Sequence, residues 1–237
     1  MKIIPNAKAL LVVGEYPKHF RFMGFLSMAL FHFPLALNRK VLFYKLMGTG
    51  KNGSFDIQPD LSKWTILVFF KQENTTNPID IQSITGTFIT KWWKRFRVQL
   101  NGYLLEPYTG HGTWDGRSFT GQEAKGFEPE GKIAVLTRAT IRISRLISFW
   151  KAVPGASYQL EHQPGLLFSI GIGEVPFIKQ ATFSFWESEA HMKAFAYGQQ
   201  HHKQVIRRTR KESWYSEEMF LRFKVLKEAL HLGQTQI

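Results

Sequence analysis

The segments VLFYKLMGTG (residues 41–50) and LLFSIGIGEV (residues 166–175) resemble each other and decide the fold. Each follows an apolar strand candidate and a helix candidate, and each precedes an aromatic strand candidate and a second helix. Both are short and rich in β-branched and aromatic residues, which favours strands over free helices. The chain therefore contains the same order of elements twice.

Periodicity extends this pattern to most of the chain. In the first half we predict strands at residues 9–14, 41–47, 64–70 and 98–105, and helices at residues 22–37 and 79–96. In the second half we predict strands at residues 133–139, 166–172 and 181–186, a helix at residues 143–153 that ends before Pro154, and a long helix from residue 189 towards residue 210.

A β-α-β-β-α-β order is the ferredoxin-like unit, and two units in one chain can pair their sheets. The predicted fold class is α+β, with two ferredoxin-like (βαββαβ) repeats fused as a dimeric α+β barrel. The repeats are expected at residues 1–105 and 132–237, in one compact domain overall. Residues 106–131 hold six glycines and two prolines and are predicted to be a Gly-rich connector.

Composition excludes several classes of protein. Hydrophobic residues make up 44% of the 237 residues and aromatic residues 15%, which excludes a disordered chain. The absence of cysteine excludes disulfides, thiolate nucleophiles, zinc fingers, iron–sulfur clusters and thiolate-ligated haem.

The chain is basic, with 31 Lys and Arg against 18 Asp and Glu, a net charge of +13. No acidic residue occurs at positions 16–55 or 131–160. A solvated basic face, an anionic membrane surface and a nucleic acid would each fit this charge. Because the aromatic residues lie inside strand and helix patterns, where burial in the core is common, we do not expect a nucleic acid partner.

Residues 22–38 form an uncharged stretch of seventeen residues, shorter than the roughly 20 that a spanning helix needs. We expect a buried or interface-seeking helix here, flanked by Lys18, Arg21, Arg39 and Lys40. The N-terminus has no signal-peptide pattern, so the expected location is cytoplasmic, with peripheral contact to the inner membrane as an extension.

One motif is formally suggestive. Gly48, Gly50 and Gly53 match the G-x-G-x-x-G spacing of dinucleotide sites, but such a site needs a helix to begin there, and a turn-like segment with Pro59 follows. A flexible loop is the better interpretation.

The helix after Trp186 carries the strongest candidate for chemistry. With about 100° between residues, His202 falls on the same face as Met192, Phe195 and Ile206, whereas His201 points away. An inward histidine is commonly a satisfied core residue, and in a chain without cysteine it is also the best candidate for a metal or haem ligand. A break at Gly198 would change the phase and make His201 the ligand. Arg207 and Arg208 begin a basic tail that suits carboxylates or a solvated helix end.

The segment GLLFSIGIGEVPFIKQATFSFWESEAHMKAFAYGQQHHKQVIRRTRKESWYSEEMFLRF (residues 165–223) strongly resembles the C-terminal half of spheroidene monooxygenases. AVLTRATIR from Ala134, FWKAVP from Phe149 and VLFYKLMGTG from Val41 resemble other segments of that family, in the same order. The resemblance covers nearly the whole chain and is weakest at residues 106–131. The doubled histidine at 201 and 202 departs from the family pattern.

The resemblance implies a haem-dependent monooxygenase that introduces a keto group into an acyclic carotenoid or a similar long apolar substrate. It also implies haem b as the cofactor, O2 as co-substrate, a ferredoxin-type electron donor and a dimeric α+β barrel. His202, or His201, would be the iron ligand, with the haem between the sheet and helix of the second repeat. Oligomerisation is left open.

The alternative is a non-catalytic haem or apolar-ligand binding protein of the same fold. Such a carrier can close the second face of the haem with another histidine, and His111 and His162 are candidates for that position. Haem degradation or peroxide chemistry on the same barrel is a further alternative.

Overall fold

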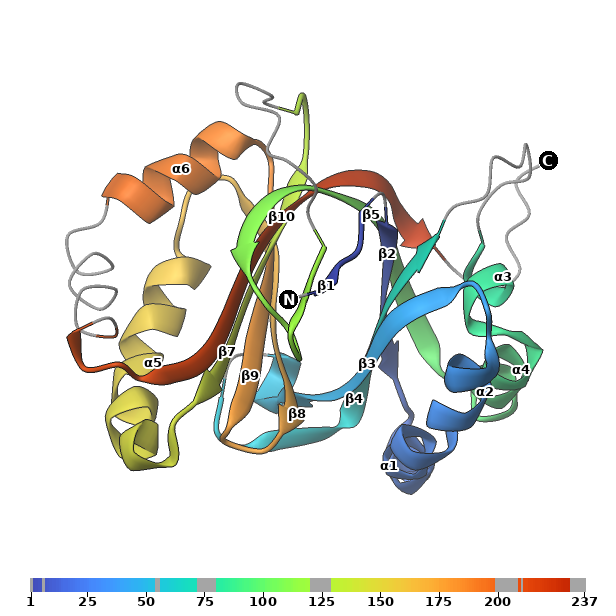
Figure 1. Cartoon of the computed structure of the whole chain (residues 1–237). Helices are drawn as coiled ribbons and strands as arrows, with labels where there is room; N and C mark the ends of the chain where they lie inside the picture. The colour runs from blue at the N-terminus through green and yellow to red at the C-terminus, as the bar shows by residue number, and fades with distance from the viewer. Residues whose placement is uncertain are drawn as a thin grey trace.

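The computed structural model describes residues 2–5, 7–53, 56–71, 80–119, 129–198, 209 and 211–230. Within them the chain forms an eight-stranded closed barrel with helices on its outside (Figure 1). The elements of the first repeat are β2 (Ala7–Glu15), α1 (Arg21–Leu30), α2 (His32–Leu37), β3 (Val41–Gly50), β4 (Pro59–Lys71), α3 (Ile81–Thr85), α4 (Thr87–Arg95) and β5 (Gln99–Gly112). Those of the second are β7 (Ile133–Ile141), α5 (Leu146–Glu161), β8 (Leu166–Val175), β9 (Lys179–Trp186), α6 (Glu189–Gly198) and β10 (Tyr215–Leu230).

The strand order is that of two ferredoxin-like sheets joined at both edges. Around the barrel the order is β10-β5-β2-β4-β3-β8-β9-β7, and β10 also pairs with β7 to close it. The first repeat contributes its fourth, first, third and second strands in that direction, and the second repeat contributes the same order read in the opposite direction. The two fourth strands, β5 and β10, therefore pair with each other, and so do the two second strands, β3 and β8. The predicted fold class, two βαββαβ repeats forming a dimeric α+β barrel, is therefore confirmed.

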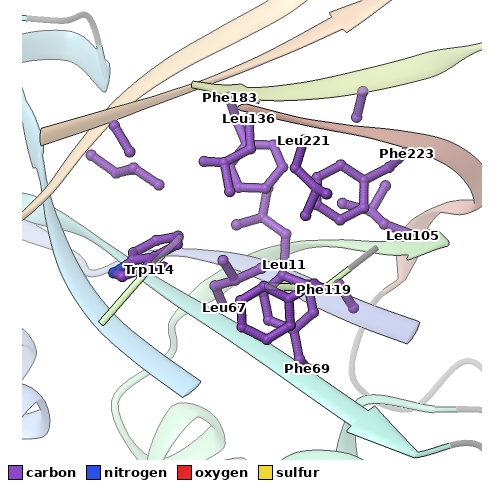
Figure 2. Close-up of a cluster of buried hydrophobic side chains, with 14 of the residues drawn as sticks. Leu11, Leu67, Phe69, Leu105, Trp114, Phe119, Leu136, Phe183, Leu221 and Phe223 are labelled. Carbon is purple, nitrogen blue, oxygen red and sulfur yellow. The ribbon is translucent and has the colours of Figure 1, made fainter. Parts of the chain in front are cut away.

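The interior of the barrel is filled with side chains rather than open (Figure 2). Leu11 and Leu67 from the first repeat meet Phe183 and Leu221 from the second, all of them buried. Phe119, from the segment after β5, stacks on Phe69 with ring centroids 3.8 Å apart. Because this core is closely packed, a large ligand has to bind outside the barrel wall.

The two junctions between the repeats differ in length. β5 and β10 pair over most of their length, from Gly112 opposite Met219 to Gly102 opposite Leu230. β3 and β8 pair only at Gly48 with Gly173 and at Thr49 with Ile172.

Several predicted boundaries are corrected by these pairings. β5 continues through Gly112, so the boundary predicted at residue 105 cuts through a strand, and the first part of the predicted connector 106–131 belongs to the barrel. A Cβ on Gly110 would lie 2.3 Å from the Phe220 carbonyl oxygen, so glycine there permits the close pairing with β10. The short strands β1 (Lys2–Ile3) and β6 (Arg117–Ser118) form a separate parallel pair.

The helices also differ from their predicted limits. The predicted helix at residues 79–96 is divided into α3 and α4 at Gly86, which has φ +88°. α5 continues through Pro154 to Glu161, although the sequence predicted an end before the proline. Pro154 itself is exposed, and the burial of Phe149 and Val153 on the other side offsets the hydrogen bond that proline removes.

The segment Lys51–Gly53 is a short 3-10 turn and is followed by β4, not by a helix that starts at the glycines. The rejection of a dinucleotide site at Gly48–Gly53 is consistent with this geometry.

Candidate functional site

A cavity of about 610 Å³ lies between the outer face of the second repeat's sheet and helices α5 and α6. In Figure 1 these two helices cover the left side of the barrel, over β7, β8 and β9. The volume is typical of a site for a cofactor or an apolar small molecule. The resemblance implied a haem between the sheet and a helix of the second repeat, and the cavity lies between that sheet and its helices.

The cavity exists because the sheet beneath it carries small side chains. Thr137 on β7 is paired with Thr182 on β9, and Ser184 and Gly171 lie on the same floor. The corresponding face of the first repeat carries bulky, fully buried residues that fill the space under its helices; these are Leu10, Val12, Ile66 and Val68. The same fold therefore has a filled layer in one repeat and a hollow layer in the other.

The walls of the cavity are apolar and partly flat. Trp186 stacks on Phe195 of α6 with ring centroids 5.5 Å apart and an interplanar angle of 28°. Met192 is buried beside them, and Phe149 and Val153 contribute from α5. The Trp186 indole donates a hydrogen bond of 2.9 Å to the Ser184 hydroxyl, so its polar edge is satisfied inside the wall.

A buried polar cluster lies where α6 begins. Glu189, the first residue of α6, accepts hydrogen bonds from Arg222 on β10 (2.9 Å) and from the Tyr108 hydroxyl on β5 (3.1 Å). Lys193 is 3.4 Å from the same carboxylate. Burial, followed by the charge and hydrogen bond of Glu189, raises the pKa of Tyr108. Tyr108 therefore stays protonated and donates.

Arg222 is the cavity-lining member of this cluster. Its Nε atom is buried, and no described residue accepts a hydrogen bond from it. Its guanidinium also lies 5.4 Å from the centre of the Phe220 ring. A largely buried guanidinium whose Nε donor has no partner among the described residues is suited to a carboxylate or another anionic group of a ligand.

Neither Arg222 nor Glu189 was predicted from the sequence. The sequence signal for Arg222 was its position between the apolar residues Leu221 and Phe223. A charged residue is almost never buried unless it is paired, so a charge at such a position indicates an ion pair.

The predicted ligands His201 and His202, and the predicted carboxylate partners Arg207 and Arg208, lie outside the described residues. The chain lines the cavity at Tyr197, before that segment, and again at Thr209, after it. The described residues on both sides of the predicted histidines thus belong to the cavity wall.

The other two histidines considered as second ligands differ in position. His111 lies at the rim of the cavity, where its ring stacks on Phe220 with centroids 5.6 Å apart. His162 is at the exposed end of α5, and its Nδ1 atom is 2.8 Å from the carbonyl oxygen of Tyr158. His111 is therefore the better placed of the two. The described residues contain no group of three or more His, Asp or Glu that could hold a metal ion.

Comparison with solved structures supports the same fold. An aldoxime dehydratase crystallised with butyraldoxime aligns with a TM-score of 0.59, covering 92% of this chain and 79% of that chain at 9% identity. A second aldoxime dehydratase structure aligns with a TM-score of 0.54, covering 92% of this chain and 81% of that chain at 9% identity. At this identity the likeness concerns the fold alone.

Comparison with curated proteins gives a closer relationship, although no protein-family model matches the chain. The spheroidene monooxygenase of Rhodobacter capsulatus is 36% identical over 197 residues, which are 81% of this chain and 79% of the relative. The enzyme of the same name from Cereibacter sphaeroides is 32% identical over 188 residues, 79% of this chain and 56% of that longer relative. Identity at this level over most of both chains shows that the protein belongs to the spheroidene monooxygenase family.

Proposed function

We propose that this chain is a haem-dependent monooxygenase that introduces a keto group into an acyclic carotenoid, using O2 and electrons from a ferredoxin-type donor. Its family members are named spheroidene monooxygenases, which makes the chain an oxidoreductase of the carotenoid monooxygenase type. The observation that carries the proposal is the hollow layer of the second repeat, with apolar walls and the largely buried guanidinium of Arg222.

The residues of the cavity fit a haem group. The stacked Trp186 and Phe195 rings provide a flat apolar surface, and the small floor residues leave room for a planar macrocycle. The free Nε donor of Arg222 suits a propionate, in addition to the predicted Arg207 and Arg208. Because the chain has no cysteine, a histidine is the expected iron ligand: His202, or His201.

The haem would supply the activation of O2 and the oxidation of a substrate carbon, and the protein would supply position and environment. Met192, Phe149 and Val153 would hold the polyene by apolar contact and exclude water from the reacting carbon. The Ser184 hydroxyl accepts the Trp186 hydrogen bond and keeps its own proton to donate towards the cavity.

The first test is a comparison of His202→Ala with His201→Ala. We expect His202→Ala to lose haem retention and to shift the Soret band, whereas His201→Ala leaves both nearly unchanged. The absorption spectrum of the purified protein, with its shift on addition of CO, is the measurement. Equal loss in both variants would show that the helical phase is wrong, and unchanged spectra in both would refute histidine ligation by this segment.

The second test separates an oxygenase from a carrier. The wild-type protein with haem, O2, reduced ferredoxin and an acyclic carotenoid is expected to form a keto product, detected by chromatography and mass. Haem and carotenoid binding without any product would favour the carrier alternative.

A further inference from the structure

Helix α1 exposes its two phenylalanines and buries Gly24 and Ser27. Gly24, Ser27 and Phe31, the residue that follows the helix, share an i, i+3, i+7 spacing and are buried. Gly24 lies over Trp64 of β4, and Phe31 packs on Trp92 and Trp93 of α4. On the opposite side Phe22 is 66% exposed and Phe25 61% exposed. A helix that serves only the core of its own chain has the reverse arrangement.

The inversion follows from the contacts below the helix. A Cβ on Gly24 would lie 2.5 Å from Nε1 of Trp64, so only glycine allows the helix to approach this ring. The Ser27 hydroxyl donates a 2.6 Å hydrogen bond to the Gly24 carbonyl oxygen, which satisfies its polar atom inside the contact. The helix is thereby held with its phenylalanines facing outwards.

Helix α2 extends the same surface. Phe33 is 73% exposed and Leu37 is 66% exposed, whereas Leu35 is buried. We define the α1–α2 face as Phe22, Phe25, Leu30, Phe33 and Leu37. It lies on the first repeat, on the far side of the barrel from α5 and α6 (Figure 1).

The charge on the segment that carries the α1–α2 face is of one sign. Lys18 and Arg21 stand at its beginning and Arg39 at its end, and no acidic residue occurs between positions 16 and 55. Of the nearby acids, Glu15 lies 3.7 Å from Lys63. Burial alone would raise the pKa of Asp60, but hydrogen bonds from Ser62 and the charges of Lys63 and Arg21 outweigh burial and lower it. Lys18 and Arg39 are thus the cations that we assign to the bilayer.

We propose that the α1–α2 face docks on the surface of an anionic lipid bilayer. Exposed phenylalanines inserted among the headgroups, with cations at both ends, are the features of a helix that lies in the membrane interface. A second copy of this chain fits less well, because two such faces would bring like charges together.

The segment lies on the bilayer rather than crossing it. Residues Lys18–Leu37 are long and apolar enough to span a membrane by length and composition. However, Gly24, Ser27, Phe31 and Leu35 are buried inside the first repeat, and the helix is divided at Phe31. Only the outer face is free to enter lipid.

The surface is on the first repeat, so its test does not depend on haem or on the proposed oxidation. If the proposed function holds, docking brings the enzyme to the compartment in which a water-insoluble polyene dissolves.

The experiment is co-sedimentation of the full chain with vesicles of phosphatidylcholine, with and without phosphatidylglycerol. We expect binding to the anionic vesicles that weakens as salt rises, because exposed charges are screened over about 10 Å at 0.1 M. The variant with Phe22→Ser, Phe25→Ser and Phe33→Ser should bind at least about tenfold more weakly. Its thermal midpoint should fall only slightly, because the three rings are mostly exposed and Phe25 loses an edge contact with Trp64. Lys18→Gln and Arg39→Gln should each lower binding about fivefold on anionic vesicles only.

The matched control is Tyr158→Ser on α5, which removes an aromatic ring that is 65% exposed on the other repeat. It should bind as wild type does. Absence of wild-type binding, or equal binding by the triple-Phe variant, would overturn the proposal. A third outcome would also overturn the proposal: the wild type does not bind vesicles and is a dimer by analytical ultracentrifugation, whereas the triple-Phe variant is a monomer. This result would show that a second copy of the chain covers the α1–α2 face.

Discussion

Thr182 faces the cavity from the middle of β9, directly across the ladder from Thr137 of β7. In the first repeat the outer face of the sheet is filled by Val12 opposite Ile66 and by Leu10 opposite Val68. Leucine and isoleucine are larger than threonine, so this difference between the two faces helps to separate a filled core from a ligand site. Local propensity does not reveal the difference, because isoleucine and threonine both favour strands.

We predict that Thr182→Phe prevents haem binding by filling the floor of the cavity while the fold persists. The added ring enters existing space, so the thermal midpoint should be retained or raised. Titration with haem, followed in the Soret region, is the measurement. Ser216→Phe, on the exposed side of β10, is the control and should bind haem as wild type does. Normal haem binding by Thr182→Phe would place the ligand elsewhere.

At the same scale, Arg222→Met is predicted to destabilise the protein. Glu189 is buried, and the loss of Arg222 leaves its carboxylate, among the described residues, with Tyr108 and Lys193. Removal of one member of a buried ion pair typically costs about 3–5 kcal/mol, and the partial exposure of Arg222 and the remaining Lys193 place the expected loss at or below about 3 kcal/mol. Urea unfolding measures it, and an unchanged midpoint would show that the cluster carries no stability.

At the level of elements, the backbone conformation of Gly86 sets the boundary between helices α3 and α4. Apolar periodicity is continuous across residues 79–96, which predicted a single helix. Gly86 interrupts it with φ +88° and ψ 163°, a conformation that is essentially restricted to glycine. The Asp80 side chain caps α3 by accepting a hydrogen bond from the Ser83 amide.

Gly86→Ala is therefore predicted to lower the free energy of unfolding by about 1–3 kcal/mol. Apart from its chain neighbours, no atom of the described residues lies within 4 Å of the position that the new Cβ would occupy, so the expected cost is backbone strain. Gly48→Ala on β3 is the matched control, since its Cβ would meet Trp64 at an ordinary 3.5 Å. Equal midpoints for the two variants in chemical denaturation would contradict the strain argument.

Over the whole molecule, the short β3–β8 junction is reinforced by charge. Lys45 on β3 pairs with Glu174 on β8 and with Asp115, and the Trp114 indole donates to Glu174 at 2.7 Å. Further along the same network, Arg138, inside the barrel wall, contacts Glu217 at 2.6 Å. Ion pairs and hydrogen bonds thus join the repeats where few backbone pairs do.

This network predicts a loss of stability in acid. Burial alone would raise the pKa of Glu217, but hydrogen bonds from the Gly116 amide, Thr113 and Arg138, with the Arg138 charge, outweigh burial and lower it. Lys45 and Lys179 likewise overcome burial and lower the pKa of Asp115. A carboxyl group whose pKa is lower in the folded state contributes its full stability above its unfolded pKa and loses it as the pH falls through the folded value.

The free energy of unfolding should therefore be steady above about pH 5 and fall below the ordinary glutamate value of 4.5. Glu217→Gln should be less stable at pH 7 and show a shallower decline in acid. Urea midpoints at several pH values test this. Parallel curves for wild type and Glu217→Gln would rule out Glu217 as a contributor to the decline.

Local sequence patterns were enough to predict the repeated order of strands and helices apart from its last strand, because periods of two and of 3.6 residues are properties of local segments. The strand β10 (Tyr215–Leu230), which closes the barrel between β5 and β7, was not predicted. The strands at residues 41–50 and 166–175 could be predicted from their aromatic and β-branched residues without knowing which strands they pair with. The sequence also carried the resemblance to the spheroidene monooxygenases, since 36% identity extends over most of the chain.

Tertiary structure decided what those elements face. In a helix that is apolar on all sides, the sequence cannot distinguish Phe31, which is buried, from Phe25, which is exposed; Trp64 and Gly24 make that choice. The extension of β5 through Gly112 depends on a β10 strand more than 100 residues away, between Met219 and Leu230. The cavity likewise arises from small residues on three strands that meet only in the folded sheet. Burial is a property of contacts between distant segments, so a local pattern limits the possible arrangements and packing selects among them.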